Sequence, residues 1–132
     1  MIVYRGGVTL TRMPEDALFS EEKLAELHQI ANGNMDFLNK IATTYIQQFE
    51  AKYPELEAAV ESNDYAKVEQ IGHLLKGASY SVGLNQTALL FHDLEVAGEN
   101  AHLDGAYETL AMIESHSKRF LTEWNTHFEQ FT

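Results

Sequence analysis

The sequence predicts an all-α protein, an up-and-down antiparallel four-helix bundle with an additional short N-terminal helix. Apolar residues recur at intervals of three and four along most of the chain, as they do on one side of an amphipathic helix. No segment alternates apolar and polar residues in the manner of a half-buried strand. The apolar stretches are joined by short connections, which favour antiparallel packing of successive helices.

The length of 132 residues predicts one domain. Residues 1–19 contain Gly6-Gly7 and Pro14 but no sustained period, so we expect a loosely ordered leader there. Residues 20–132 then form the helical bundle domain.

The first two predicted helices are separated by Asn32-Gly33-Asn34, a stop and restart signal. Ser20 is a candidate cap for the first helix, near 20–31, with Leu24, Leu27, Ile30 and Ala31 as its apolar residues. We expect Pro54 to bend the second helix, because proline removes a backbone donor and crowds the preceding turn. Ser62-Asn63 ends this helix. Its apolar residues are Phe37, Leu38, Ile41, Tyr45, Ile46, Phe49, Leu56, Ala59 and Val60.

Three further helices complete the prediction. Asp64 is suited to cap the third, which runs to Gly83 with an apolar stripe of Val68, Ile71, Leu75, Ala78 and Val82. The fourth runs from about Asn85 to Gly98 with Ala88, Leu89, Phe91, Leu94, Val96 and Ala97. The fifth begins near Asp104 and carries Tyr107, Leu110, Ile113, Phe120, Leu121, Trp124 and Phe128.

The composition excludes several classes of function. The 20 acidic and 9 basic residues give a net charge of −11, which disfavours nucleic acid and anionic membranes as partners. No apolar run approaches the ~20 residues that cross a bilayer, and the N-terminus lacks the pattern of a signal peptide. A cytoplasmic location is therefore expected. The absence of cysteine excludes thiolate metal sites and thiol catalysis.

The third predicted helix carries the residues that suggest chemistry. At 100° per residue, His73 lies opposite the apolar stripe and should face solvent. Lys76, Gly77, Glu69 and Tyr80 fall within about 60° of it on the same face.

Gly77 calls for an explanation, because glycine inside a helix costs about 0.5–1 kcal/mol relative to alanine. A bare backbone one turn from His73 would leave room for a group on the imidazole or for a docking protein. The ammonium of Lys76 suits an anionic phosphoryl group. Neutral imidazole is a competent nucleophile, so these three residues indicate a phosphorylatable histidine.

Glu95 is the candidate for orienting the imidazole, since a carboxylate that accepts the ring N–H fixes its tautomer. It lies twelve residues after Gly83 and His73 lies ten before it. In an antiparallel helix pair these separations bring the two side chains to similar height.

The segment His73-Leu74-Leu75-Lys76-Gly77-Ala78-Ser79, followed by Gly83-Leu84, closely resembles the signature of histidine-containing phosphotransfer (HPt) domains. The resemblance extends over about residues 20–130. It includes the acidic turn Glu61-Ser62-Asn63-Asp64 before the histidine helix and the pair Leu94-Glu95 after it.

The resemblance implies a four-helix bundle that carries a phosphoryl group between receiver-domain aspartates. His73 would be the phosphoacceptor, Lys76 would stabilise the phosphoryl charge and Gly77 would give access. The position matching Glu95 is often glutamine in relay proteins of this family, whereas phosphotransfer domains of chemotaxis kinases have glutamate. Where the family usually has a small residue this chain has Tyr80, which either contacts the docking receiver or covers apolar surface.

The implied partners are response-regulator receiver domains, a hybrid sensor histidine kinase, or both. The chain has no nucleotide-binding loop, so we expect a carrier without kinase activity of its own. It needs no cofactor, and Mg²⁺ is expected on the partner receiver. We expect a monomer, since no extra heptad seam is present.

Two other functions compete with this interpretation. One is a non-catalytic acidic adaptor that binds partner helices in an apolar groove, which leaves Gly77 unexplained. The other is a metal site of Glu69, His73, His92 and Glu95. Its spacing differs from the Glu-x-x-His motif of di-iron bundles. The remaining histidines are interpreted as surface or boundary residues: His28, His92, His102, His116 and His127.

Overall fold

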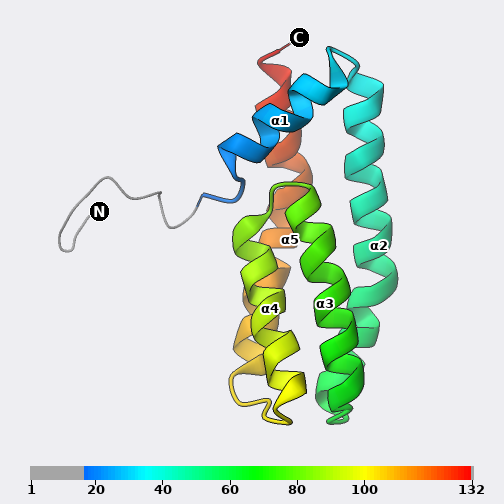
Figure 1. Cartoon of the computed structure of the whole chain (residues 1–132), viewed down its shortest axis with the longest axis vertical. Coiled ribbons are helices and arrows are strands. Elements are labelled where there is room, and N and C mark those ends of the chain that lie inside the picture. Colours follow the sequence, from blue (N-terminus) through cyan, green and yellow to red (C-terminus); the bar gives the residue numbers. More distant parts are fainter. Residues whose placement is uncertain (1–16, 132) are drawn as a thin grey trace, which may run out of the picture.

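The computed structural model describes residues 17–131. In chain order the described residues form α1 (Glu21–Ala31), α2 (Met35–Glu61), α3 (Tyr65–Ser81), α4 (Asn85–Glu99) and α5 (Ala106–Glu129), and they contain no strand. The four longer helices run up and down beside one another, and the short α1 lies across one end of them (Figure 1). The predicted all-α bundle with an extra N-terminal helix is confirmed.

Helices α1, α2 and α3 begin where short polar side chains satisfy free N–H groups of the first turn. The side-chain oxygens of Ser20, Asn34 and Asp64 each accept a hydrogen bond from the backbone N–H three residues further on. The predicted caps at Ser20 and Asp64 are therefore confirmed. Pro54 lies inside α2, which continues past it to Glu61 as one helix.

Two hydrophobic clusters hold the bundle together, one above the other along its length. The cluster nearer α1 is rich in aromatic rings and consists of Leu18, Phe19, Leu24, Leu27, Ala31, Leu38, Ala42, Tyr45, Val82, Leu84, Phe120, Trp124 and Phe128. The other consists of Tyr53, Leu56, Ala59, Val60, Val68, Ile71, Leu75, Phe91, Leu94, Ala106, Leu110 and Ile113. The predicted apolar stripes supply most of both clusters.

The last residues of the predicted leader pack against the bundle. Leu18 and Phe19 were assigned to the leader, yet they are only 3% and 9% exposed. The ring of Phe19 packs against Trp124 with centroids 6.0 Å apart, and the N–H of Ser20 donates to the carbonyl of Gly83 at 2.8 Å. Two adjacent apolar residues show no helical periodicity, so their burial could not be predicted from the spacing of apolar residues. The rest of the predicted leader, residues 1–16, lies outside the described residues.

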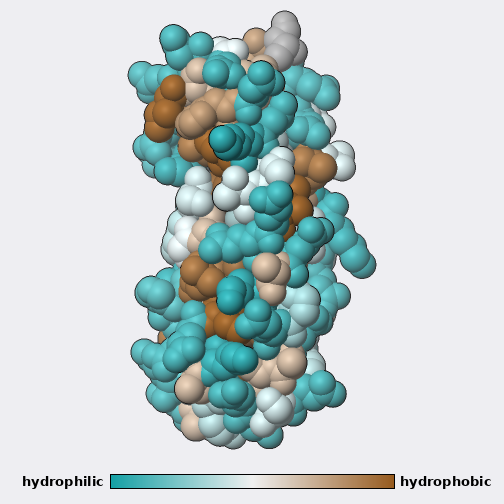
Figure 2. Space-filling model, turned by 90° about the vertical axis from the view of Figure 1, so that its right-hand side faces the viewer, coloured by the Kyte–Doolittle hydropathy of each residue, from teal (hydrophilic) through white to brown (hydrophobic). Residues whose placement is uncertain are grey.

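Some residues counted in the predicted stripes are exposed, namely Ile30, Phe37, Leu89, Tyr107 and Leu121. Apolar side chains therefore reach the surface in places, and on the face shown in Figure 2 they form separate patches among hydrophilic residues. In the described part of the chain, no helix has the length and apolar character required to cross a membrane.

Helices α3 and α4 approach each other closely, because two glycines remove the side chains between them. A Cβ on Gly72 would lie 3.0 Å from the backbone N of Glu95. A Cβ on Gly98 would lie 2.6 Å from the backbone N of Glu69. This glycine seam, defined by Gly72 and Gly98, sets the distance across which side chains of α3 and α4 can meet.

Candidate functional site

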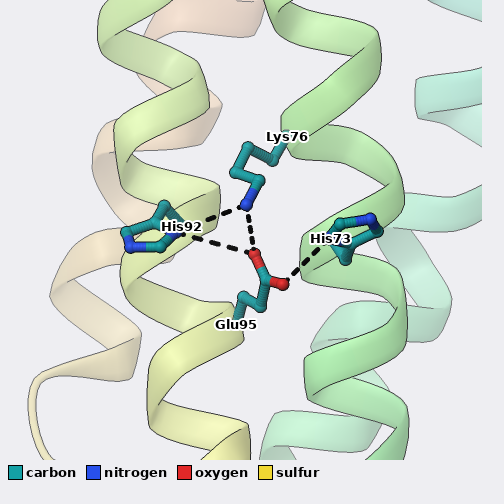
Figure 3. A network of polar contacts seen from close by, with 4 residues as sticks. All are labelled: His73, Lys76, His92 and Glu95. Atoms are coloured by element: carbon teal, nitrogen blue, oxygen red, sulfur yellow. Dashed lines mark hydrogen bonds and ion pairs between the residues drawn. The ribbon is translucent and has the colours of Figure 1, made fainter.

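The imidazole of His73 projects from α3 into solvent, with 70% of its side chain exposed. It lies on the side of the helix opposite the buried Leu75, as the sequence predicted. Its Nδ1 is 2.8 Å from Oε2 of Glu95 on α4 (Figure 3). The hydrogen bond engages one ring nitrogen and leaves Nε2 pointing away from the carboxylate.

Glu95 lies between the two helices, where its side chain is only 14% exposed. Its second oxygen, Oε1, is 2.7 Å from Nζ of Lys76. Because Gly72 allows the backbone of α4 to touch α3, the carboxylate lies within hydrogen-bonding reach of both side chains. The structure thus brings together three of the predicted site residues, His73, Lys76 and Glu95.

The electrostatics of this group favour an ionised carboxylate. Burial on its own raises the pKa of Glu95, but the hydrogen bonds and charges of Lys76 and His73 outweigh burial, and the net pKa lies below the ordinary value of 4.5. An ionised carboxylate only accepts hydrogen bonds, so Nδ1 of His73 is the donor in this contact. A neutral ring would then carry its lone pair on Nε2.

Gly77 lies one turn along α3 from His73. A Cβ added there would meet no atom within 4 Å, so contacts among the described residues do not explain the glycine. Tyr80 lies on the same face and is 41% exposed. The surface beside His73 is therefore open at Gly77 and bordered by an aromatic ring.

The motif that begins at His73 also contains residues that support the bundle. Leu75 is fully buried in the core. Ser79 is also fully buried, and its hydroxyl lies 3.0 Å from the hydroxyl of Tyr45 on α2, within hydrogen-bonding distance. Outward-facing residues at His73 and Gly77 thus alternate with inward-facing residues that position the helix.

His92, predicted to be a surface or boundary histidine, is exposed and also lies beside the site. Its Nδ1 lies 3.6 Å from Oε1 of Glu95 and 3.5 Å from Nζ of Lys76 (Figure 3). The signal that could have identified it is its place three residues before Glu95, since side chains with that spacing share a helix face.

The other histidines have different surroundings. His116 is partly buried, with Nδ1 2.7 Å from the hydroxyl of Thr87, and burial lowers its pKa with a smaller contribution from Arg119. His102 pairs with Asp104 at 3.2 Å on the surface. His28 stacks on the ring of Phe131, and His127 lies edge-on to Phe128.

The predicted alternative of a metal site does not match this geometry. Across residues 17–131, no group of three or more His, Asp or Glu side chains is arranged to hold a metal ion. The ammonium of Lys76 already lies against Glu95, where it would repel a second cation.

The chain is similar to known proteins both in sequence and in fold. The model of the Hpt domain matches residues 40–131. The "Multistep phosphorelay regulator 1" of Schizosaccharomyces pombe (strain 972 / ATCC 24843) is 26% identical over 98 residues, which cover 69% of this chain and 33% of that protein. The chain thus matches about a third of the length of this relative.

A solved structure shows the same fold. Histidine-containing phosphotransfer protein B (HptB) from Pseudomonas aeruginosa PAO1 superposes with a TM-score of 0.75 at 17% identity, covering 89% of this chain and 99% of that one. Since the match to the family model covers well over half of the sequence, the chain belongs to the Hpt domain family.

Proposed function

We propose that this protein carries a phosphoryl group in a two-component phosphorelay, accepting it on Nε2 of His73 from a receiver-domain aspartate and passing it to a response regulator. The observation that carries the proposal is the hydrogen bond of 2.8 Å between Nδ1 of His73 and Glu95. It leaves the other ring nitrogen as an exposed nucleophile.

The chemistry follows from this tautomer. The lone pair of Nε2 attacks phosphorus, the P–O bond to the aspartate breaks, and the aspartate leaves as a carboxylate. The imidazole ring becomes positively charged, and the ionised Glu95 stabilises that charge through Nδ1–H. In the second transfer the ring departs as neutral imidazole, so the same hydrogen bond supports both directions.

Lys76 and Gly77 fit the remaining needs of the transfer. Lys76 places a positive charge one turn from His73, where it would offset the charge of the phosphoryl oxygens. The open space at Gly77 would let a receiver bring its aspartate close to Nε2.

The finer parts of the proposal concern what the partner supplies. We expect no kinase activity from this chain, with Mg²⁺ and much of the transition-state stabilisation coming from the receiver. Receivers and a hybrid kinase are the proposed partners, supported by the name of the fission-yeast relative, which is a phosphorelay regulator. We also propose that the protein is cytoplasmic and monomeric.

The test is phosphoryl transfer from a phosphorylated receiver to this protein and to His73→Gln, with His102→Gln as a matched control because that side chain is also 70% exposed. The wild type and the control should gain a label that is labile in acid and stable in base. His73→Gln should gain none. A label that survives His73→Gln would refute the assignment.

An acidic adaptor is the second candidate, and one observation favours it. A groove of about 440 Å³ lies between α1, α2 and α3, with mostly apolar walls that include Leu27, Phe37, Ile41 and Val82. An adaptor would keep its signalling output in His73→Gln, whereas a phosphoryl carrier would lose it.

A further inference from the structure

Tyr80 is an exposed aromatic residue on the same face of α3 as His73, and it is 41% exposed. It follows His73 by seven residues, which places it about 10 Å further along the helix axis and within about 20° of the same direction. Gly77 lies between them on this face and carries no side chain. The imidazole and the phenol therefore stand on the two sides of a gap.

Contacts inside the protein do not account for the ring of Tyr80. It belongs to neither hydrophobic cluster. Within residues 17–131 its side chain makes no hydrogen bond and its ring packs on no other ring. Tyr45 and Tyr53, by contrast, are buried and hydrogen-bonded. The contacts that hold these two tyrosines in the bundle thus have no counterpart at Tyr80.

The ring also leaves the approach to His73 open. A Cβ added to Gly77 would meet no atom within 4 Å, so the phenol of Tyr80 does not lie over the glycine. A bulky group can therefore reach Nε2 of His73 across Gly77, with the ring of Tyr80 at the edge of its path.

A receiver domain that reaches His73 must also cover Tyr80. A transient interface covers about 500–600 Å² on each partner, which corresponds to a disc about 13 Å in radius. Centred on His73, such a disc includes a residue about 10 Å away on the same face of the helix. A small phosphoryl donor does not extend that far. Tyr80 is thus placed to contact a protein donor and not a small one.

We propose that Tyr80 is a specificity-determining residue of the transfer, whose ring fits an apolar recess beside the phosphorylated aspartate of the receivers that this protein serves. A receiver with a bulky or charged side chain at that place would be held away from Nε2 of His73. Tyrosine suits this role, because it offers a large contact area with only two side-chain torsions to immobilise. The inference rests on the proposed function, since it concerns the choice of receiver.

The first experiment compares Tyr80→Ala and Tyr80→Phe with the wild type, using a set of phosphorylated receivers from the source organism. Tyr80→Ala should lower kcat/KM about tenfold with the receiver that the wild type prefers, as the loss of a central aromatic contact does in an interface. Receivers that the wild type uses poorly should lose less or should gain. Tyr80→Phe should keep the wild-type preference, because the ring makes the contact.

Two controls separate docking from chemistry. Phosphoramidate is a small donor whose P–N bond breaks with loss of ammonia as a new P–N bond forms at His73, and it should label every variant at the wild-type rate. Tyr107→Ala is the matched substitution, since Tyr107 is 63% exposed and lies beside Glu57 and Glu61, between α2 and α5. It should accept the phosphoryl group like the wild type from every receiver.

The second experiment measures binding without transfer. The unphosphorylated receiver that binds the wild type most tightly is titrated into each protein in a calorimeter. Its dissociation constant should be about tenfold higher for Tyr80→Ala and unchanged for Tyr107→Ala.

The outcomes distinguish this inference from the proposed function. If the receivers label Tyr80→Ala at the wild-type rates and in the same order, the role of Tyr80 is wrong and the carrier stands. Equal slowing with phosphoramidate, or a Tyr80→Phe that behaves like Tyr80→Ala, also overturns the role. A wild type that takes no label from any donor refutes the carrier. The titrations then decide the contact, and receiver binding that is absent, or unchanged in Tyr80→Ala, overturns it.

Discussion

Gly72 and Gly77 stand five residues apart on the same helix and have opposite surroundings. A Cβ on Gly72 would meet three backbone atoms of α4 between 3.0 and 3.2 Å away. A Cβ on Gly77 would meet nothing within 4 Å. Gly72 thus serves contact inside the molecule, whereas Gly77 leaves a surface open to something outside it. The same residue type allows close helix packing in one place and leaves an open surface in the other.

The largest effect should come from Gly98→Ala, in the glycine seam. The new Cβ would lie 2.6 and 2.7 Å from the backbone of α3, which cannot rotate away as a side chain would. The helices must separate, and we expect unfolding free energy to fall by about 2 kcal/mol, in the range typical of overpacking. Urea denaturation with an unchanged slope would measure it. An unchanged midpoint would show that the seam is adaptable.

Gly72→Ala should cost less, about 1 kcal/mol, because contacts of 3.0–3.2 Å require smaller shifts and alanine favours the helix. Its nearest contact is the backbone N of Glu95, so the substitution should also disturb the carboxylate. The hydrogen bond to Nδ1 of His73 would lengthen. The measurement is the ¹⁵N chemical shifts of the His73 ring, which report the tautomer. Unaltered shifts would contradict the link between seam and site.

Gly77→Ala should act in the opposite direction on stability. With no clash to offset it, the better helix former should raise unfolding free energy by about 0.5–1 kcal/mol. Transfer from a receiver should slow, while labelling by phosphoramidate should not change. Equal slowing with both donors would show that Gly77 acts on the chemistry rather than on docking.

The smallest effect concerns acid. The folded pKa of Glu95 lies below 4.5, so the unfolded chain binds its proton more readily. The stabilising contribution of Glu95 is therefore complete above the ordinary glutamate range and is lost as pH falls through the lower folded pKa. Glu95→Gln should flatten this part of the profile of unfolding free energy against pH, on the acid side of the ordinary glutamate range. An unchanged slope would contradict the lowered pKa.

Much of the fold followed from local sequence signals. The caps at Ser20 and Asp64 were identifiable because each places an acceptor before an apolar period. Leu89 and Tyr107 were misassigned to buried stripes, because an apolar side chain at the edge of a stripe is exposed if no neighbouring helix covers it. Which helix covers which edge is a tertiary property that periodicity does not contain.

The site was also predictable where its residues lie close in sequence, and less so where they meet only through tertiary contacts. His73, Lys76 and Gly77 share one helix, so their spacing alone placed them on one face. Glu95 was identified because its separation from Gly83, twelve residues, is similar to the ten residues between His73 and Gly83. His92 was missed because its contact depends on how far Lys76 reaches across to α4. Gly72 escaped notice although it lies on the buried side of a helix, where a missing side chain indicates a close neighbour.

The hydrogen bond from Ser20 to Gly83 has a mechanical consequence. It ties the start of the described chain to the turn between α3 and α4 at 2.8 Å, ten residues from His73. Leu18 and Phe19 are buried just before Ser20, so this segment is anchored both in the core and on the turn. Since the turn joins the two helices that carry His73 and Glu95, the segment before α1 braces the end at which these two helices are connected.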